Sequence, residues 1–197
     1  MLENINFHDF AESMMKILEL KDKYTRGHSS RVADYTSMIA KEMNFTTEEV
    51  KFFHIAAHLH DIGKVIISDS IINKKGKLTE EEFEKIKKHP VTGYEILNKV
   101  KGLKEMAQII RGHHERWDGE GYPDKLKGEN ILIGSRIITV ADAFDAMTST
   151  RSYRTALGIQ KSLEILEKNK WKQFDGEIVD IFIKIIKENG RKLCVLQ

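Results

Sequence analysis

Helical periodicity is the feature of this sequence that most constrains its fold. Apolar side chains recur at spacings of three and four residues almost throughout the 197 residues, as in Val32, Tyr35 and Ile39. Proline breaks helix interiors, and the chain contains only two prolines, Pro90 and Pro123. We therefore predict an all-α protein that forms a single helical bundle domain.

The predicted helices cover most of the chain. Thr46 with Glu49, and Thr79 with Glu82, have the spacing of capping boxes, so a helix should open at each threonine, the first running to about residue 61. Isoleucine and valine in 65–72 and 131–140 also suit strands, but neither run alternates strictly, so we favour helix or an irregular turn. A long polar loop is expected near 116–130. Further helices are predicted over 8–20, 28–43, 90–100, 103–115, 133–149, 159–169 and 176–189.

Bulk properties exclude several classes of protein. Apolar residues make up 41% and charged residues 31%, which is ordinary for a globular domain. The formal charge of +2 is too small for a protein that coats DNA. No apolar run approaches the roughly 18–20 residues of a membrane span, and the N-terminus lacks signal-peptide features, so we predict a cytoplasmic location. The single cysteine, Cys194, excludes an internal disulfide and a cysteine-built zinc site.

Histidines and aspartates provide the candidate chemistry. Neighbours on a helix point about 100° apart, so His60-Asp61 can serve two adjacent metal positions while His113-His114 approaches from another side. Imidazole and carboxylate ligands suit iron, manganese, zinc or nickel better than calcium or magnesium. Any one of these histidines alone is more often a packed or surface residue, and the joint pattern changes that balance. The candidate ligands are His28, His60, Asp61, His89, His113, His114 and Asp142.

An ordered series of motifs over about 20–185 resembles the HD-GYP family, a branch of the HD metal-dependent phosphohydrolases. The series is YTRGHSSRV at 24–32, HDIGK at 60–64, GKLTEEEFEKIKKH at 76–89, HHERWDGEGYP at 113–123, RIITVADAFDAMTSTRSYRTA at 136–156 and FDGEIV at 174–179. The HHE-x-W-D-G-x-G-Y-P block separates this branch from other HD proteins. The resemblance implies an HD-type bundle with a GYP loop over 20–197, preceded by an N-terminal helical extension over 1–19.

The resemblance also implies a two-metal phosphodiesterase that hydrolyses cyclic di-GMP. Two divalent ions, iron or manganese, would activate a bridging water to hydroxide, with Asp61 bridging both. One ion would take His28, His60, Asp61 and Asp142, and the other would take His89, His113 and His114.

Four residues match the family's substrate contacts. Lys64 would offset charge near the phosphate and act with Asp61 in catalysis, or be a solvated lysine after a helix end. Arg151 and Arg154 would grip phosphate, or form surface ion pairs. Tyr122 would line the substrate pocket. Trp117 fits a base-stacking platform or a buried loop anchor equally well.

Three positions depart from the family pattern. Tyr24 stands where some members have a glutamate that helps to hold a third metal, which favours two ions here. His54, His58 and Asp61 fall on one helix face, which predicts either a network that orients Asp61 or a hydrogen-bonded core histidine. Gly176 replaces the proline of the FDP motif, and Asp175 should still cap the helix.

Other functions remain open at this stage. The domain could bind cyclic di-GMP or a diguanylate cyclase with little turnover, or hydrolyse another nucleotide such as a hybrid cyclic dinucleotide. A homodimer is a further expectation for its partners. The first helix carries an apolar stripe of Phe10, Met14, Ile17 and Leu18, which should pack on the domain or, as the alternative, on a partner subunit.

Overall fold

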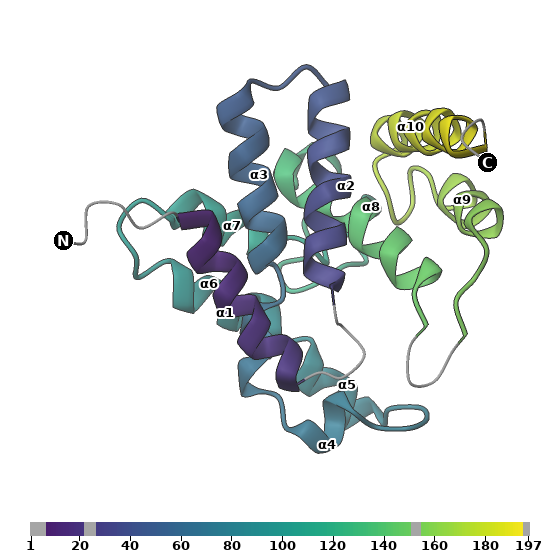
Figure 1. Ribbon diagram of the computed structural model, residues 1–197. Helices are drawn as coiled ribbons and strands as arrows, with labels where there is room; N and C mark the ends of the chain where they lie inside the picture. The colour runs from purple at the N-terminus through teal and green to yellow at the C-terminus, as the bar shows by residue number, and fades with distance from the viewer. Residues whose placement is uncertain (1–6, 22–26, 151–154, 195–197) are drawn as a thin grey trace.

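The computed structural model describes residues 7–21, 27–150 and 155–194, and these parts of the chain are helical, as predicted (Figure 1). The only β pairing among them is an isolated bridge between Lys170 and Phe174. None of the helices in these ranges has the length and apolar character needed to cross a membrane. The elements are α1 (Phe7–Lys21), α2 (His28–Glu42), α3 (Thr47–Leu59), η1 (Ile62–Ile66), α4 (Asp69–Ile72), α5 (Glu80–Ile86), α6 (His89–Leu97), α7 (Lys104–Arg111), η2 (Gly128–Asn130), α8 (Ile133–Thr148), α9 (Ile159–Lys168) and α10 (Gly176–Cys194).

Helices α2 and α3 form a hairpin that lies side by side with its neighbours α1 and α8 (Figure 1). The turn is sharp because Asn44 takes a left-handed backbone conformation after α2. The capping box predicted at Thr46 and Glu49 is confirmed at the start of α3, and the one at Thr79 and Glu82 opens α5. Local sequence therefore fixes where these helices begin.

Helix α8 runs through the centre of the core. Its residues Ile137, Ile138 and Val140 are fully buried, and Phe144 meets the ring of Phe182 from α10 edge to face at 4.9 Å. The run 131–140 is therefore a loop followed by helix, and the preference for helix over strand there is confirmed. The run 65–72 likewise contains η1 and α4.

Several helices end earlier than predicted, and two of these changes concern the candidate site. Helix α3 ends at Leu59 instead of about residue 61, and α7 ends at Arg111 instead of 115. In each case the chain turns away from the helix axis at the His60-Asp61 and His113-His114 pairs. These side chains are consequently presented by turns at helix ends.

The predicted packing of the first helix's apolar stripe on the domain is wrong for most of the stripe, and packing on a partner subunit stays a prediction. Phe10 and Ile17 are 51% and 63% exposed, whereas Ala11 and Met15 lie in the core and Leu18 packs against it. The helix packs against α3 through the small side chain of Ala11 and the flexible side chain of Met15. This leaves an exposed apolar surface on the opposite side of α1.

Candidate metal centre

Seven residues predicted as metal ligands come together where five helices begin, end or cross. His28 starts α2, His60 and Asp61 follow α3, His89 starts α6, His113 and His114 follow α7, and Asp142 lies within α8. Their nitrogen and oxygen atoms form three overlapping groups, each with all atoms within 4.8 Å of one another. We call these residues the seven-residue cluster. The groups are His28, His60 and Asp142; His89, His113 and His114; and His60, Asp61 and His113.

Backbone carbonyls fix the orientation of three of these imidazoles. The Nδ1 atoms of His60, His89 and His113 lie 2.6, 2.8 and 2.5 Å from the carbonyl oxygens of Ala57, Ile86 and Ile110, each three residues earlier. A carbonyl only accepts, so each Nδ1 carries the proton. Each Nε2 is therefore left with a lone pair that points into the cluster, an arrangement common among metal-binding histidines.

Asp61 lies between the groups, with one carboxylate oxygen toward each. Its Oδ2 is 3.4 Å from His60 Nε2, 3.8 Å from His28 Nε2 and 2.7 Å from Lys64 Nζ. Its Oδ1 is 3.4 Å from His89 Nε2. The side chain is thus placed to contact two different positions at once.

The donor set fits divalent cations. His60 Nε2 is buried and has no hydrogen-bond partner, although a carboxylate oxygen lies 3.4 Å away. The Nε2 atoms of His89 and His113 also face each other at 3.2 Å, and both carry lone pairs. Acceptors that converge in a buried site repel one another unless a cation lies between them. The arrangement therefore matches a site for imidazole- and carboxylate-binding metals.

The carboxylate of Asp145 binds the ring nitrogen of His28 that points away from the cluster. Asp145 Oδ2 accepts a hydrogen bond from His28 Nδ1 at 2.7 Å, while Arg31 donates to both carboxylate oxygens of Asp145. The Nε2 of His28 faces Asp142 Oδ1 at 3.3 Å. Burial lowers the pKa of His28, but hydrogen bonds with Asp142 and Asp145 outweigh this effect and raise the pKa to about 9.

The pKa values of His89, His113 and His114 shift in the opposite direction. Burial lowers the pKa of His89 to about 3, with His114 adding to the effect, and lowers that of His114 to about 4. Burial would raise the pKa of Asp61, but Lys64 and the nearby histidines hold it well below its usual range. At neutral pH the protein alone thus keeps His89 and His114 neutral and Asp61 ionised, which are the forms that bind metals, whereas metal binding at His28 has to displace a proton.

The GYP loop covers the His114 side of the cluster. The Tyr122 ring stacks on His114 with centroids 4.9 Å apart, and the Tyr122 backbone N–H donates to the His114 carbonyl at 3.2 Å. Buried Glu115 accepts from the backbone N–H groups of Asp124 and Leu126 at 2.7 and 3.1 Å. Gly121 is required because a Cβ there would lie 2.4 Å from the Arg116 nitrogen. The loop is therefore anchored to the same turn that carries the histidine pair.

Trp117 is held within the protein. Its ring packs against Trp171 at 5.2 Å and under the Arg136 guanidinium at 5.8 Å, and the backbone N–H of Trp117 donates to the Gln173 carbonyl. These contacts favour the loop anchor over the base-stacking platform. Asp175 accepts from the Glu177 N–H at 3.0 Å, so the predicted cap of α10 is confirmed. Arg151, Arg154 and Tyr24 lie outside the described residues.

Of the two predictions for His54 and His58, the hydrogen-bonded core histidine is confirmed for His58, and the network to Asp61 is wrong. The partners of Asp61 are His28, His60, His89 and Lys64, whereas His54 and His58 turn toward His8 of α1. The helical face extrapolated to Asp61 does not continue, because α3 ends at Leu59. Burial lowers the pKa of His54, and lowers that of His58 to about 4. We call His8, His54 and His58 the three-histidine cluster.

Two residues with direct roles in this geometry were missed from the sequence. Asp145 lies one helical turn after Asp142 on α8, and Arg31 lies one turn after His28 on α2. The spacing of three residues in each pair was the available indication that they share a face. Thr139 was also missed; its hydroxyl donates to the His113 carbonyl at 2.7 Å.

Comparison with known proteins identifies the family of this chain. The profile of the HD domain family matches residues 12–178. The chain belongs to the HD domain family. The His60-Asp61 pair at the centre of the seven-residue cluster is the HD dipeptide, and the similar proteins are consistent with the HD-GYP branch of this family.

Two curated relatives of this HD domain protein, and one solved structure, illustrate the similarity. The 3′3′-cGAMP-specific phosphodiesterase 3 of Vibrio cholerae is 42% identical over 82% of this chain and 35% of the relative. A cyclic di-GMP phosphodiesterase of Thermotoga maritima is 40% identical over 92% of this chain and 51% of the relative. The crystal structure of the V. cholerae cyclic GMP-AMP phosphodiesterase V-cGAP3 aligns with a TM-score of 0.74 at 19% identity, over 94% of this chain and 50% of that one. The chain thus spans about a third to a half of these proteins.

Proposed function

We propose that this HD domain protein is a metal-dependent phosphodiesterase that hydrolyses cyclic di-GMP. The observation that carries the proposal is the convergence of the unprotonated Nε2 atoms of His60, His89 and His113 on the two carboxylate oxygens of Asp61. Such a buried array of acceptors has no structural use without cations. Names of relatives that hydrolyse cyclic dinucleotides support the reaction class.

The cofactors we propose are two divalent ions, iron or manganese. His28, His60 and Asp142 would hold one ion, His89, His113 and His114 the other, and Asp61 would contact both. The two oxygens of Asp61, which face different histidines, support this division. When bound, such a pair lowers the pKa of a water molecule and holds phosphate oxygens.

The protein's own side chains would orient and neutralise the substrate. Lys64 lies 2.7 Å from Asp61 at the edge of the cluster, so its ammonium can offset negative charge on a phosphate placed there. Burial raises the pKa of Tyr122, so its hydroxyl remains protonated and can donate to a phosphate oxygen. By resemblance, Arg151 and Arg154 would supply further phosphate contacts.

The identity of the bases is the least constrained part of the proposal. Relatives named for cyclic di-GMP and for 3′3′-cGAMP have similar identity to this chain, at 40% and 42%. The hybrid dinucleotide is therefore the second candidate substrate. Both carry the same phosphodiester backbone, which is the part that the seven-residue cluster, Lys64 and Tyr122 would contact.

A substrate panel tests the proposal. Chain loaded with iron or manganese under reducing conditions is incubated with cyclic di-GMP, 3′3′-cGAMP and cyclic di-AMP, and binding and turnover are measured on the same sample. Hydrolysis of cyclic di-GMP, lost on chelation, is expected. Tight binding with all three nucleotides left intact, under both reducing and oxidising conditions, would instead indicate a signalling module.

We also propose that helix α1 carries a surface for a protein partner. The exposed apolar side chains of Phe10, Ile17 and Leu20 on α1 supply a surface on which a second copy of the chain or a diguanylate cyclase could dock. Light scattering of the isolated chain tests self-association. A monomer at all concentrations, with no change after Ile17→Lys, would contradict the dimer.

A further inference from the structure

The three-histidine cluster lies apart from the seven-residue cluster, between α1 and α3. His8 belongs to the first turn of α1, and His54 and His58 are one turn apart on α3. One ring nitrogen from each lies within 4.8 Å of the other two. Together the two clusters contain all eight histidines of the chain. Every histidine of the chain therefore lies close to at least one other.

The ring nitrogens have the spacing of ligands around one ion. His54 Nε2 lies 3.1 Å from His8 Nε2 and 3.2 Å from His58 Nε2. Tetrahedral zinc with Zn–N distances near 2.0–2.1 Å separates its nitrogen ligands by about 3.3 Å. The His89–His113 pair in the seven-residue cluster has the same Nε2–Nε2 distance, 3.2 Å.

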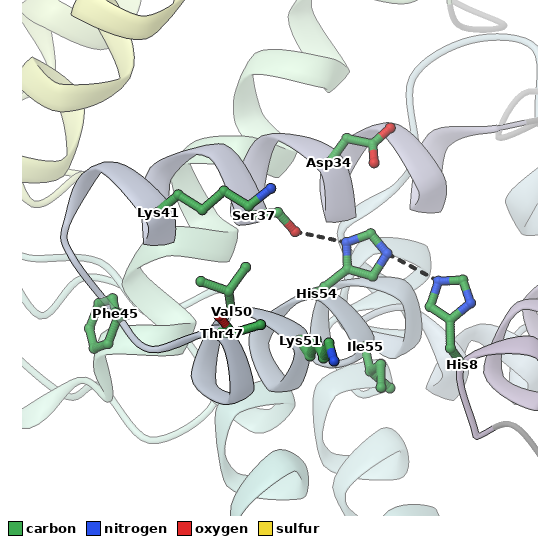
Figure 2. Close-up of a pocket in the computed structure, with 10 residues that line it drawn as sticks. All are labelled: His8, Asp34, Ser37, Lys41, Phe45, Thr47, Val50, Lys51, His54 and Ile55. Carbon is green, nitrogen blue, oxygen red and sulfur yellow. Dashed lines mark hydrogen bonds between the residues drawn. The ribbon is translucent and has the colours of Figure 1, made fainter.

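Hydrogen bonds on the far side of His54 direct its lone pair into the cluster. Its Nδ1 lies 3.1 Å from the Ala33 carbonyl and 2.8 Å from the Ser37 hydroxyl, and that hydroxyl donates to the same carbonyl. Both contacts are satisfied only if Nδ1 carries the proton. Figure 2 shows the ring held between Ser37 on one side and His8 on the other. This is the same device that directs His60, His89 and His113.

A pocket beside the cluster leaves room for a further ligand. A cavity of about 690 Å³ is lined by His8 and His54 together with Lys41 and Lys51 (Figure 2). A tetrahedral ion bound by three imidazoles keeps one position for water or an exogenous group. The lysines favour an anion in that position.

We propose that His8, His54 and His58 bind one divalent transition-metal ion of the zinc type, separate from the seven-residue cluster. The ion joins α1 to α3 by coordination from both helices. Because α3 ends directly before His60 and Asp61, the ion also fixes the first helix against the element that presents the HD pair. No side chain is shared between the two sites.

Zinc titration of the metal-free, tag-free chain tests this site. Zinc per chain is measured by elemental analysis after desalting, and affinity by calorimetry, for the native chain, His8→Gln and the control Glu12→Gln. Glu12 is exposed on the same helix. We expect His8→Gln to bind one zinc ion fewer than the native chain and the control, with at least about a tenfold loss of affinity for that ion.

The choice of variant keeps the result interpretable. The His8 side chain is 38% exposed, so its replacement leaves the core intact, and circular dichroism verifies the fold. Replacement of bound zinc by cobalt gives visible absorption bands that should weaken in His8→Gln and in His54→Gln. Equal zinc content, affinity and cobalt spectra in the native chain and both variants would overturn the proposal.

A companion variant separates this site from the proposed function. His113→Ala should lose zinc and turnover at the seven-residue cluster yet keep the His8-dependent ion. The readout is the difference made by His8, so it holds whether or not the chain hydrolyses a cyclic dinucleotide. Loss of the His8-dependent ion in a folded His113→Ala chain would contradict two separate sites.

Discussion

The seven-residue and three-histidine clusters orient imidazoles by the same kind of hydrogen bond, but they differ in their other groups. In both, a backbone carbonyl takes the Nδ1–H of an imidazole and leaves Nε2 pointing inward, and Nε2 atoms face one another at 3.1–3.2 Å. Only the first cluster includes carboxylates, Asp61 and Asp142, among its proposed ligands. Outside the proposed ligands, Asp145 accepts from His28 Nδ1 at 2.7 Å, whereas Asp9 Oδ1 lies 3.5 Å from His8 Nδ1. The first cluster is also covered by a loop that carries an additional candidate substrate contact, Tyr122.

This difference shows what the carboxylates contribute. Two cations repel each other at close range unless anionic ligands lie between them, and Asp61 is the residue placed to do this. Three imidazoles match a single ion with one further ligand. The first cluster is therefore equipped to act on a phosphodiester, and the second to hold two helices together.

The largest expected effect comes from neutralising Asp61. Asp61→Asn keeps the side-chain volume but removes the charge that faces His60 and His89, so turnover should fall by at least about 10³-fold. Metal content of the seven-residue cluster should fall with it. Steady-state hydrolysis and elemental analysis on one sample measure both. Retained turnover would mean that the site lies elsewhere.

Asp145→Asn should have the next largest effect. Asp145 touches His28 and Arg31 but none of the other proposed ligands, so it is a positioning residue. Loss of its charge should weaken metal binding at His28 by about 10–100-fold, measured by titration of metal-free chain. Asp180→Asn on the exposed face of α10 is the matched control. Addition of excess metal should restore turnover in Asp145→Asn, and an unrescued loss would argue for a different role.

Glu115→Gln should act on substrate binding and stability through the GYP loop. The amide accepts only one of the two backbone N–H groups, from Asp124 and Leu126, that the carboxylate accepts. One buried N–H without a partner costs about 1–3 kcal/mol of unfolding free energy. Urea unfolding should show this loss, and KM should rise while kcat is largely kept. An unchanged KM would show that the loop does not order the substrate site.

Ser37→Ala should have the smallest effect on metal affinity. It compares the loss of a hydroxyl partner of an imidazole with the loss of a carboxylate partner in Asp145→Asn. The Ala33 carbonyl still accepts the His54 Nδ1–H after the hydroxyl is removed. Zinc affinity of the three-histidine cluster should therefore fall by less than about tenfold, below the range expected when a carboxylate partner is lost. A drop as large as that in His8→Gln would show that the hydroxyl, and not the carbonyl, orients His54.

The sequence predicted the helices better than it predicted their faces and ends. Capping boxes at Thr46 and Thr79 are local patterns, and both were found where expected. The buried side of α1 was assigned to large apolar residues, but packing against α3 selects Ala11 and Met15 because they allow close approach. Such choices depend on the partner surface, which no periodicity reveals.

The candidate site was likewise predicted in part: its individual residues were identified, but the grouping of the other histidines was not. Ordered motifs identified the seven residues that the fold brings together, because histidine and aspartate in those positions are recognisable one by one. The grouping of His54 and His58 with His8 depends on where α3 ends and on how α1 packs against it. His8 and His54 are 46 residues apart in the chain. Helical spacing alone suggested either a network to Asp61 or a hydrogen-bonded core histidine, and neither prediction included His8.

The most direct test of the central claim is turnover of cyclic di-GMP as a function of metal added to the metal-free chain. Activity should be absent without metal, rise as the seven-residue cluster fills with two ions per chain, and not depend on the His8-dependent ion. A chain that holds two ions in this cluster and leaves cyclic di-GMP and 3′3′-cGAMP intact, or one that hydrolyses them fully in excess chelator, would contradict the account.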